Sequence, residues 1–478
     1  MAFQQITAES RASTSRAGEL VPFSDALRVW LRVAALSFGG PAGQIAVMHR
    51  ILVEEKRWIG ETRFLHALNY CMLLPGPEAH ELAIYIGWLL NRVRGGLAAG
   101  ILFVLPGLIA LSVLSTIYAV YGQIGIIKAL FFGLKAAVLA IVLEAVMRVG
   151  KRALRNRAQV AIAAAAFVGI FAFGAPFPLI IALAAAAGLA GSAANLGWFR
   201  SGGHEAKTES GPAALIDAAF AREVPKHVRP STVRFAVAAI AGALVWLGPI
   251  AGLALVFGPD SIFVRIGLFN AKMAVVTFGG AYAVLAYMAQ QAVQFYHWLK
   301  PGEMLVGLGF AETTPGPLIS VVQYVGFMAA FRAPGALDPV AAGLLGGAVA
   351  MWATFVPPFL WIFLGGPYIE ALIGNRALNA ALSAITAAVV GVILNLVVWF
   401  GLHVIFQRTV SVELGLLHVT LPVVESVNWA ALALSAAAII AIFRLRIGMI
   451  PVFAACSIAG AAYYVCMTAF GLGNLVHL

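Results

Sequence analysis

Ionisable side chains follow a Pro-Gly-Pro turn inside the apolar stretch LLPGPEAHELAIYIGW, residues 73–88. Glu78, His80 and Glu81 come directly after this turn, and Glu312 comes shortly before a second Pro-Gly-Pro. An ionisable group within a hydrocarbon layer is costly and is therefore a functional candidate by default. We interpret these four residues as candidates for taking up a proton. Packing of His80 and pairing of Glu81 with a nearby arginine are the alternatives.

A Pro-Gly-Pro turn inside a span also breaks the helix and leaves backbone N–H groups without helical partners. Pro77 suits the first position of a new helix, whose N–H groups and positive dipole end would point at the break. Such a helix end binds anions, and the second turn, centred on Gly316, would supply another. Glu78 would stand in the first turn of the new helix, where it is either stabilised by the dipole or competes with an anion. A plain proline kink is the structural alternative for each turn.

Basic residues inside the apolar stretches would supply positive charge to a bound anion. Arg32 and Lys272 each stand six residues before a Phe-Gly-Gly, and Lys135 lies near the middle of another apolar stretch. The alternatives are that Arg32 snorkels to the membrane surface and that either lysine forms a structural ion pair with a glutamate such as Glu144.

The composition identifies the surroundings of these residues. Of the 478 residues, 62% are hydrophobic and 11% are charged, whereas a soluble domain carries about 25% charged residues. No soluble core could hide this much apolar surface, so we predict an all-α polytopic membrane protein in a lipid bilayer. The net charge of +11 fits basic loops on one membrane face better than a nucleic-acid partner.

The sequence contains neither a phosphate-binding loop nor a metal-like spacing of His and Cys. Cys71, Cys456 and Cys466 all lie in apolar stretches and are interpreted as packing thiols. We therefore expect no cofactor, no metal and no enzymatic reaction. Uphill transport would then draw on an ion gradient or on the membrane potential.

Apolar stretches of roughly 20 residues, the length that crosses a bilayer as a helix, predict thirteen spans. They are 27–48, 64–90, 97–120, 124–147, 158–173, 176–194, 235–257, 263–289, 304–331, 340–364, 377–405, 428–443 and 449–471. The polar stretch after the sixth span is predicted to carry a short amphipathic helix near Pro212–Arg222. The predicted divisions are a polar cytoplasmic N-terminus (1–26), a first membrane repeat (27–194), a basic cytoplasmic linker (195–234), a connecting transmembrane helix (235–262) and a second membrane repeat (263–478).

Lys and Arg in the loops predict the orientation in a cell inner (cytoplasmic) membrane. The basic loop 147–157, the linker and residues 444–446 fall on one face if the spans alternate, which places the N-terminus in the cytoplasm and the C-terminus outside. The loop 49–63 disagrees, because its four basic residues fall on the predicted outer face. A re-entrant first or second span would change this local count.

The chain repeats itself at an offset of 240 residues. Phe-Gly-Gly at residues 38–40 recurs at 278–280, and the first Pro-Gly-Pro recurs at 315–317. An insertion of 11 residues near FRAPGALDP follows, after which Pro106 matches Pro357. One extra span separates the copies, so the halves are predicted to be inverted-topology repeats, which is typical of secondary transporters with a site at the repeat interface.

The predicted substrate site combines both breaks with the basic residues. Besides Arg32, Lys135, Lys272 and Glu78, its candidates are Gly39, Gly40, Pro41, Gly76, Pro77, Gly279, Gly280, Thr314 and Gly316. The paired glycines either let helices approach closely or expose backbone amides to a ligand, and the sequence leaves both readings open.

Three segments resemble the chromate ion transporter family: FGGPAGQIAVMH, RWIGETRFLHALNYCMLLPGPEAHELAIYIGWL and GGLAAGILFVLPG. The resemblance is dense over residues 28–150, and residues 265–395 are similar to the second half of the long-chain, two-domain members. The motif positions carried over are Phe38, Gly39, Gly40, Pro41, Trp58, Pro75, Gly76, Pro77, Glu78, Tyr85 and Gly87. His80 and Glu81 depart from the uncharged residues usual after the motif.

The resemblance implies efflux of chromate across the cytoplasmic membrane by a secondary transporter, which gives chromate resistance. Chromate is a tetrahedral dianion close to sulfate in shape, and no residue is seen that would reject sulfate. A carrier of sulfate or another oxyanion, and an anion channel built on the same repeat, are the alternatives. A homodimer is compatible with the sequence.

Overall fold

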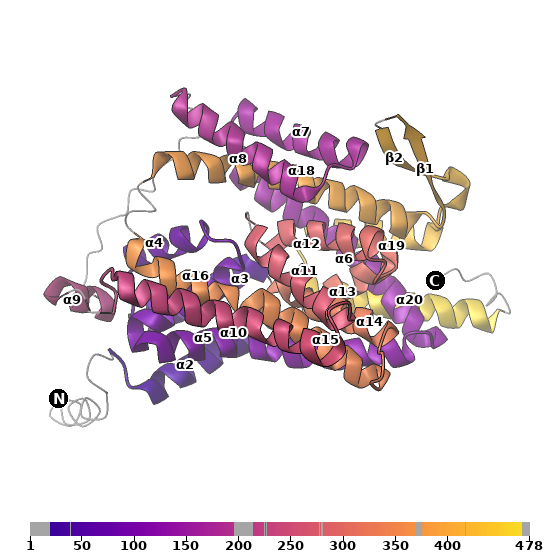
Figure 1. Ribbon diagram of the computed structural model, residues 1–478. Helices are drawn as coiled ribbons and strands as arrows, with labels where there is room; N and C mark the ends of the chain where they lie inside the picture. The colour runs from indigo at the N-terminus through magenta and orange to yellow at the C-terminus, as the bar shows by residue number, and fades with distance from the viewer. Residues whose placement is uncertain are drawn as a thin grey trace.

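The chain forms an almost entirely helical protein in the computed structural model (Figure 1). The structure describes residues 20–38, 40–195, 214–223, 225, 227–276, 278, 281–369, 375–415 and 417–470. Gly39, Gly279 and Gly280, three of the predicted site residues, lie outside the described residues. The predicted all-α polytopic class is confirmed, because six described helices are long and apolar enough to cross a bilayer.

The helices of the first half and the linker are α2 (Phe23–Leu36), α3 (Gly40–His49), the π-helix η1 (Arg50–Glu55), α4 (Glu61–Cys71), α5 (Glu78–Tyr121), α6 (Gly125–Ala153), α7 (Arg157–Phe173), α8 (Phe177–Ala193) and α9 (Leu215–Arg222). The connecting helix is α10 (Thr232–Phe257). Helix α9 confirms the short helix predicted in the linker.

The second half contains α11 (Ile262–Val276), α12 (Ala281–Ala289), the π-helix η3 (Gln290–Phe295), α13 (Pro301–Thr313), η4 (Leu318–Ser320), α14 (Val321–Arg332), α15 (Pro339–Phe355), α16 (Pro357–Gly365), η5 (Gly366–Tyr368), α18 (Arg376–Ile405), β1 (Thr409–Leu414), β2 (Leu417–Pro422), η6 (Val424–Ser426), α19 (Trp429–Phe443) and α20 (Met449–Ala469). The antiparallel hairpin β1–β2 was not predicted. Its strands, TVSVEL and LHVTLP, are rich in β-branched residues.

Helix α5 is a helical hairpin. The backbone leaves the helical region at Asn91 (φ −133°, ψ 30°) and Arg92 (φ 55°, ψ −149°). A Cβ atom added to Gly87 would lie 2.5 Å from the carbonyl oxygen of Gly95 and 2.8 Å from the Cβ atom of Ala99. In a straight helix, residues eight and twelve positions apart would be about 12 and 18 Å apart, so the two parts of α5 run back along each other.

The segments predicted as the first two spans are re-entrant hairpins. Leu20 N donates to Leu90 O (2.9 Å), and Leu215 N of the linker donates to Arg57 O (3.1 Å). The start of α2, the end of η1, the start of α4 and the end of the first part of α5 therefore gather at one end of the molecule. The predictions of 27–48 and 64–90 as continuous spans were wrong, because each apolar stretch enters and returns at a break.

The second half repeats this arrangement. Arg332, at the end of α14, donates to Trp298 O (2.7 Å), and its guanidinium also pairs with Glu303 of α13 (2.5 Å). Helices α13 and α14 thus return to a common end, and 263–289 and 304–331 are also broken pairs of helices. The π-helices η1 and η3 begin at residues 50 and 290, which is the offset of the sequence repeat.

The last helices of each half pack on the other half. Helices α7 and α8 lie along α18, while α19 and α20 pack on α6 (Figure 1). Gly133 allows the approach of α20, because a Cβ atom there would lie 1.9 Å from the carbonyl oxygen of Cys456. Such close packing through small residues is typical of membrane helices.

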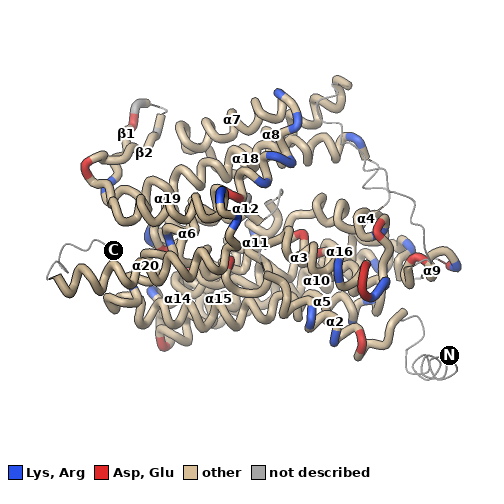
Figure 2. Tube along the Cα trace, turned by 180° about the vertical axis from the view of Figure 1, so that it is seen from behind, with Lys and Arg blue, Asp and Glu red and all other residues tan. Residues whose placement is uncertain are grey.

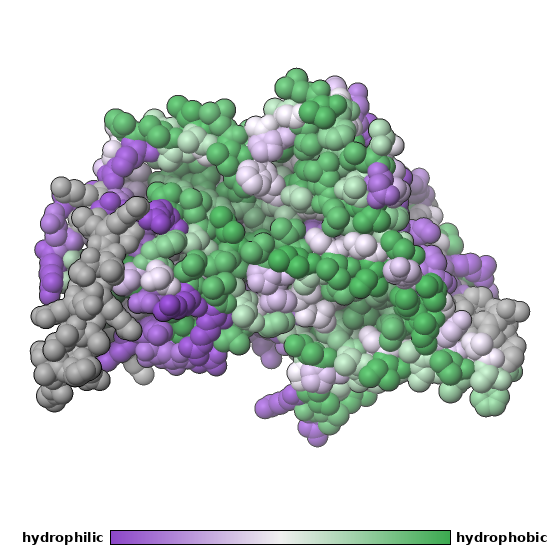
Figure 3. Space-filling model, turned by 90° about the horizontal axis from the view of Figure 1, so that it is seen from below, coloured by the Kyte–Doolittle hydropathy of each residue, from purple (hydrophilic) through white to green (hydrophobic). Residues whose placement is uncertain are grey.

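The surface fits a bilayer between two polar ends. Figure 3 shows apolar residues over much of one face, with hydrophilic residues gathered mainly toward one side. Helix α10 is largely unburied, with Leu244 67% and Leu255 89% exposed, as expected of a helix in contact with lipid. Charged residues of both signs surround α2, α4 and α9 (Figure 2).

Helix α9 closes the end at which the first hairpins return. Ile216 is fully buried there, and its N–H donates to Trp58 O (2.9 Å). Asp217 accepts from Gly60 N (2.7 Å) and pairs with Arg63 (2.6 Å). The guanidinium of Arg63 also lies over the ring of Phe220, 4.1 Å from its centroid. Helix α9 of the linker therefore packs on the returning ends of the first-half hairpins and holds them together.

Candidate functional site

The break after α2 in the first half meets the Pro-Gly-Pro turn of the second. Gly316 N donates to Ser37 O (2.9 Å), and the buried amide of Gln44 donates to Gly316 O (2.5 Å). Ser37 is fully buried, and its hydroxyl donates to Val33 O (2.6 Å). The N–H of Gly316 is thus occupied by the chain itself in this conformation.

Each Pro-Gly-Pro turn also packs on a helix of the other half. Gly316 (φ +111°) lies against α5, where a Cβ atom on Gly107 would be 2.8 Å from the carbonyl oxygen of Pro315. Gly76 (φ +154°) lies against α16, with Pro358 3.5 Å from its ideal Cβ position. Both glycines have a positive φ that other residues rarely adopt.

The first turn leads into the N-terminus of α5, which begins at Glu78, one residue after the first helical position predicted for Pro77. Pro77 is the N-cap residue, and its carbonyl oxygen accepts from the N–H groups of His80 (2.9 Å) and Glu81 (3.0 Å). Among the described residues, no backbone acceptor is found for the N–H groups of Glu78 and Ala79. Two donors therefore remain at the break, at the positive end of the helix dipole.

Glu81 is the most deeply buried of the acidic residues that the structure describes. Its side chain is fully buried, and neither carboxyl oxygen has a hydrogen-bond partner among the described residues. Its Oε1 atom lies against the turn, 2.6 Å from the ideal Cβ position of Gly76. The alternative that Glu81 pairs with Arg92 or Arg94 is not realised.

Glu78 differs from Glu81, because its side chain is partly exposed and the charge of Arg152 of α6 acts on it. Arg152 was not among the predicted site residues. It belongs to the basic loop MRVGKRALRNR, which we interpreted only as a marker of orientation. Nothing in the sequence distinguished it from its basic neighbours.

His80 lies between the two turns. Its Nε2 atom is 3.2 Å from Gly100 O, and its Nδ1 atom is buried without a partner in the described part of the chain. The ring makes edge contacts with Phe355 and Phe359, each at 5.3 Å between centroids, and a tilted contact with Phe103 at 6.2 Å. The carbonyl oxygen of Phe103 lies 3.5 Å from the ideal Cβ position of Gly316. This histidine therefore packs into an aromatic group that links the two turns.

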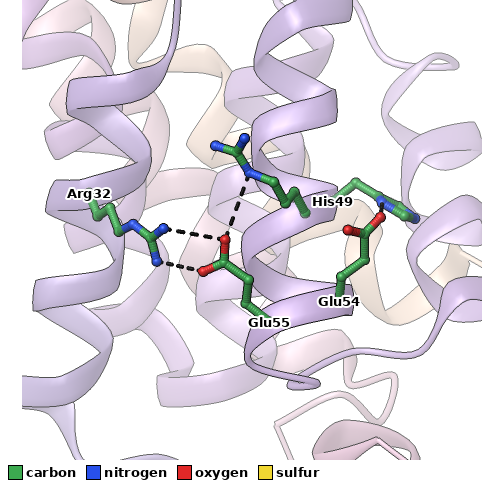
Figure 4. A network of polar contacts seen from close by, with 5 residues as sticks. Arg32, His49, Glu54 and Glu55 are labelled. Atoms are coloured by element: carbon green, nitrogen blue, oxygen red, sulfur yellow. Dashed lines mark hydrogen bonds and ion pairs between the residues drawn. The ribbon is translucent and has the colours of Figure 1, made fainter.

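The structure places Arg32 and Lys272, two of the basic residues predicted to bind an anion, in different surroundings. Arg32 forms an ion pair with Glu55 of η1 (2.5 Å), while His49 lies 3.2 Å from Glu54 (Figure 4). Lys272 is exposed. Arg32 is thus engaged with a carboxylate, and a role of these two in binding substrate stays a prediction.

Lys135 lies beside the start of α13, where its Nζ atom is 3.5 Å from the ideal Cβ position of Gly302. Glu144 pairs with Arg148, so the alternative of a Lys135–Glu144 pair is not realised. Lys135 as a substrate ligand stays a prediction.

The remaining candidates border the breaks. Pro41 is the second residue of α3, directly after Gly40, which has φ +71°. Glu312 and Thr314 are 5% and 8% exposed at the end of α13, just before the second turn. The sequence analysis missed Ser37 and Gln44, whose contacts join the two breaks. Ser37 directly precedes the Phe-Gly-Gly, which is the only signal that pointed to it.

The chain matches known proteins over most of its length. The model of the family described as "Chromate transporter" matches residues 24–189 and 264–461. A chromate transport protein of Pseudomonas aeruginosa is 32% identical over 370 residues, which are 76% of this chain and 77% of that protein. A chromate transport protein of Cupriavidus metallidurans is 28% identical over 77% of this chain and 80% of its own length.

A probable chromate transport protein of Synechococcus elongatus is 24% identical over 78% of this chain and 83% of its own length. No solved structure matches the chain. The two matched ranges of the family model flank the linker and α10, so they include both breaks of each half.

Proposed function

Because this chain belongs to the chromate transporter family, we propose that it exports chromate across the cytoplasmic membrane and thereby confers chromate resistance. The observation that carries the proposal is the contact between Gly316 N and Ser37 O (2.9 Å). It joins a break in one half to a break in the other, as expected of a substrate site at a repeat interface.

The proposed site lies at the first Pro-Gly-Pro turn and the adjoining second one. A tetrahedral dianion needs several hydrogen-bond donors, and the N–H groups of Glu78 and Ala79 are two that the described chain leaves available. Movement of the second turn away from Ser37 would release the N–H of Gly316 as a third donor. Exchange of that N–H between the chain and the anion would then accompany alternating access.

In the proposed topology the N-terminus and the C-terminus lie on opposite faces of the membrane, as the sequence predicted. The re-entrant hairpins contribute no net crossing, and the passes that remain are the second part of α5, α6, α7, α8, α10, α15 with α16, α18, α19 and α20. With the N-terminus in the cytoplasm, the loop 49–63 joins α9 on the cytoplasmic face. That placement removes the conflict between this loop and the positive-inside rule.

Transport by purified protein in liposomes tests the proposal. Labelled chromate and labelled sulfate are offered separately, with the pH gradient and the membrane potential imposed one at a time. We expect transport of chromate driven by either gradient without ATP. Transport of sulfate but not chromate, or passive flux that no gradient can concentrate, would contradict chromate export and favour a sulfate carrier or a channel.

A matched pair of variants tests the position of the site. Gln44→Leu leaves the buried Gly316 carbonyl without its side-chain donor, and we expect transport to fall about fivefold or more, because an unsatisfied buried group costs about 1–3 kcal/mol. Gln407→Leu makes the same chemical change at an exposed position and should transport normally. Equal transport by both variants would argue against a site at these breaks.

A further inference from the structure

The carboxyl group of Glu81 is buried, unpartnered and directed at the Pro-Gly-Pro turn from which α5 begins. It is 0% exposed, and its Oε1 atom lies 2.6 Å from the ideal Cβ position of Gly76. Helical side chains point back toward the N-terminus, which explains how a residue one turn into α5 reaches the turn. The N–H groups of Glu78 and Ala79, for which no backbone acceptor is found among the described residues, belong to the first residues of α5 after the same turn.

The charged and titratable groups around Glu81 do not compensate an ionised carboxylate. On its own helix the nearest are Glu78 and His80, and α4 presents Tyr70 and Cys71. Helix α16 presents Pro358 to the turn, and α6 contributes Arg152, which acts on Glu78. An unpaired charge in such surroundings costs far more than a neutral polar group, so this conformation accommodates Glu81 as a carboxylic acid.

A carboxylic acid differs from a carboxylate in one respect that matters for an anion. It carries an O–H donor, whereas the carboxylate only accepts hydrogen bonds. A neutral Glu81 would therefore add an O–H to the two free N–H groups at the turn. An ionised Glu81 would instead repel a dianion at short range.

The geometry points to the first Pro-Gly-Pro turn as an oxyanion site in which protonated Glu81 is a hydrogen-bond donor, so that one proton crosses with each oxyanion. This inference rests on the proposed function and specifies its coupling. The proton binds Glu81 on the side where the oxyanion enters. When the oxyanion leaves on the other side, the O–H bond breaks, the proton goes to water, and Glu81 is protonated again before the next turnover.

Movement of one proton together with each oxyanion determines how the membrane potential and the proton gradient act on export. A dianion with one proton moves a net charge of −1, so a membrane potential that is negative inside drives export. A proton gradient directed inward opposes the same export, whereas it would drive an exchanger of chromate for protons. The two gradients should therefore act in opposite directions on net flux.

Variants of Glu81 test the inference in liposomes that contain the full chain. Glu81→Gln keeps a donor without a titrating proton, so we expect chromate transport that no longer falls as the pH rises from 6 to 8. Glu81→Leu removes the donor and should reduce transport about tenfold or more at every pH. Glu425→Gln, the same change at an exposed position, should retain the pH profile of the unmodified protein.

Proton movement provides the second measurement, which does not depend on the folding of Glu81→Leu. A pH-sensitive dye inside the liposomes should report protons moving with chromate for the unmodified protein and a loss of this signal for Glu81→Gln. If Glu81→Gln keeps both the unmodified pH profile and the proton signal, Glu81 is only a buried structural acid and the inference is overturned. Absence of chromate transport by the unmodified protein would instead overturn the proposed function.

Discussion

The two Pro-Gly-Pro turns share their backbone geometry but differ in the side chains that follow. Both central glycines have a positive φ, and each turn packs on a helix of the other half, the first on α16 and the second on α5. After the first turn come Glu78, His80 and Glu81, whereas Leu318, Ser320 and Val321 occupy the same positions after the second. The two turns therefore share a backbone shape, but the first is followed by ionisable side chains, whereas the second is preceded by the buried acid Glu312.

The halves also differ in how their hairpins are fastened. In the second half, Glu303 of α13 pairs with Arg332 at the end of α14, with side chains 9% and 36% exposed. In the first half, position 63 carries an arginine, which pairs with Asp217 of the linker helix α9, with side chains 30% and 28% exposed. The second half is closed by its own residues, whereas the first depends on a segment outside the repeat.

Breaking the internal pair of the second half should have the largest effect. Arg332→Met leaves Glu303 with the Lys300 N–H and the Tyr118 hydroxyl as hydrogen-bond partners. Because the Arg332 side chain is itself 36% exposed, we expect a cost of about 1.5–3 kcal/mol, as for a hydrogen bond to a charged group. We expect the free energy of unfolding in detergent, measured by chemical denaturation, to fall by that amount. Arg28→Met, which alters an arginine with a 79% exposed side chain, is the control. A loss below about 1 kcal/mol for Arg332→Met would show that both halves are fastened equally weakly.

Crowding one turn should have the next largest effect. In Gly107→Ala the new methyl group would lie 2.8 Å from the Pro315 carbonyl oxygen, so the second turn must shift. Overpacking of this kind costs about 1–3 kcal/mol, and transport should fall with it. Gly252→Ala is the control, because no atom lies within 4 Å of its ideal Cβ position. Equal stability and transport in the two variants would show that the turn tolerates displacement.

The membrane class and the family were predictable because both depend on extended patterns. Low charge over the whole chain predicted the helical membrane fold, and the segments around Phe38–Pro41 and Pro75–Pro77 predicted the family. The offset of 240 residues also anticipated the placement of η1 and η3. Each of these signals is spread over many residues, so no tertiary contact is needed to detect it.

The hairpins were not predictable from hydropathy, because an apolar window of 20 residues sums both arms of a re-entrant turn. The Phe-Gly-Gly and Pro-Gly-Pro breaks indicated re-entrant spans as an alternative, and long-range contacts such as Leu20–Leu90 show that the chain does return to the same end. The surroundings of Glu81 and the contact of Gly316 with Ser37 were hidden for the same reason. Whether a carboxyl group has a partner is decided by helices distant in sequence, here α4, α6 and α16.

Weakening the linker fastening should have a smaller effect than Arg332→Met. Asp217→Asn removes the charge from the pair with Arg63 but keeps an oxygen that can accept from Gly60 N. Because the pair is partly exposed, we expect a loss of about 0.2–1 kcal/mol. Hydrogen exchange at the backbone N–H groups of Leu215 and Ile216 measures the loss locally. A decrease as large as that of Arg332→Met would mean that α9 is as essential to its half as the internal pair is to the other.

The smallest expected effect concerns the pH dependence of the same fastening. His227 follows α9 and contacts Trp88 edge-on, with 5.3 Å between ring centroids. Burial and, to a smaller extent, the charge of Arg92 lower the pKa of His227 from 6.5 to about 4. The docked linker therefore binds fewer protons than a released one. Its docking is strongest above about pH 6.5 and weakens as the pH falls toward 4.

Hydrogen exchange of Ile216 N–H, compared at pH 7.5 and 5.5 after correction for the intrinsic rate, should thus show faster opening at the lower pH. His227→Phe keeps an aromatic ring against Trp88 but cannot be protonated, so its corrected exchange should not change between these two conditions. Arg332→Met serves as the control, because its effect lies in the other half and should leave the pH dependence of Ile216 intact. If Ile216 exchange in His227→Phe keeps the pH dependence of the unmodified protein, another group causes that pH dependence. The linker would then be held by Asp217 without a contribution from His227.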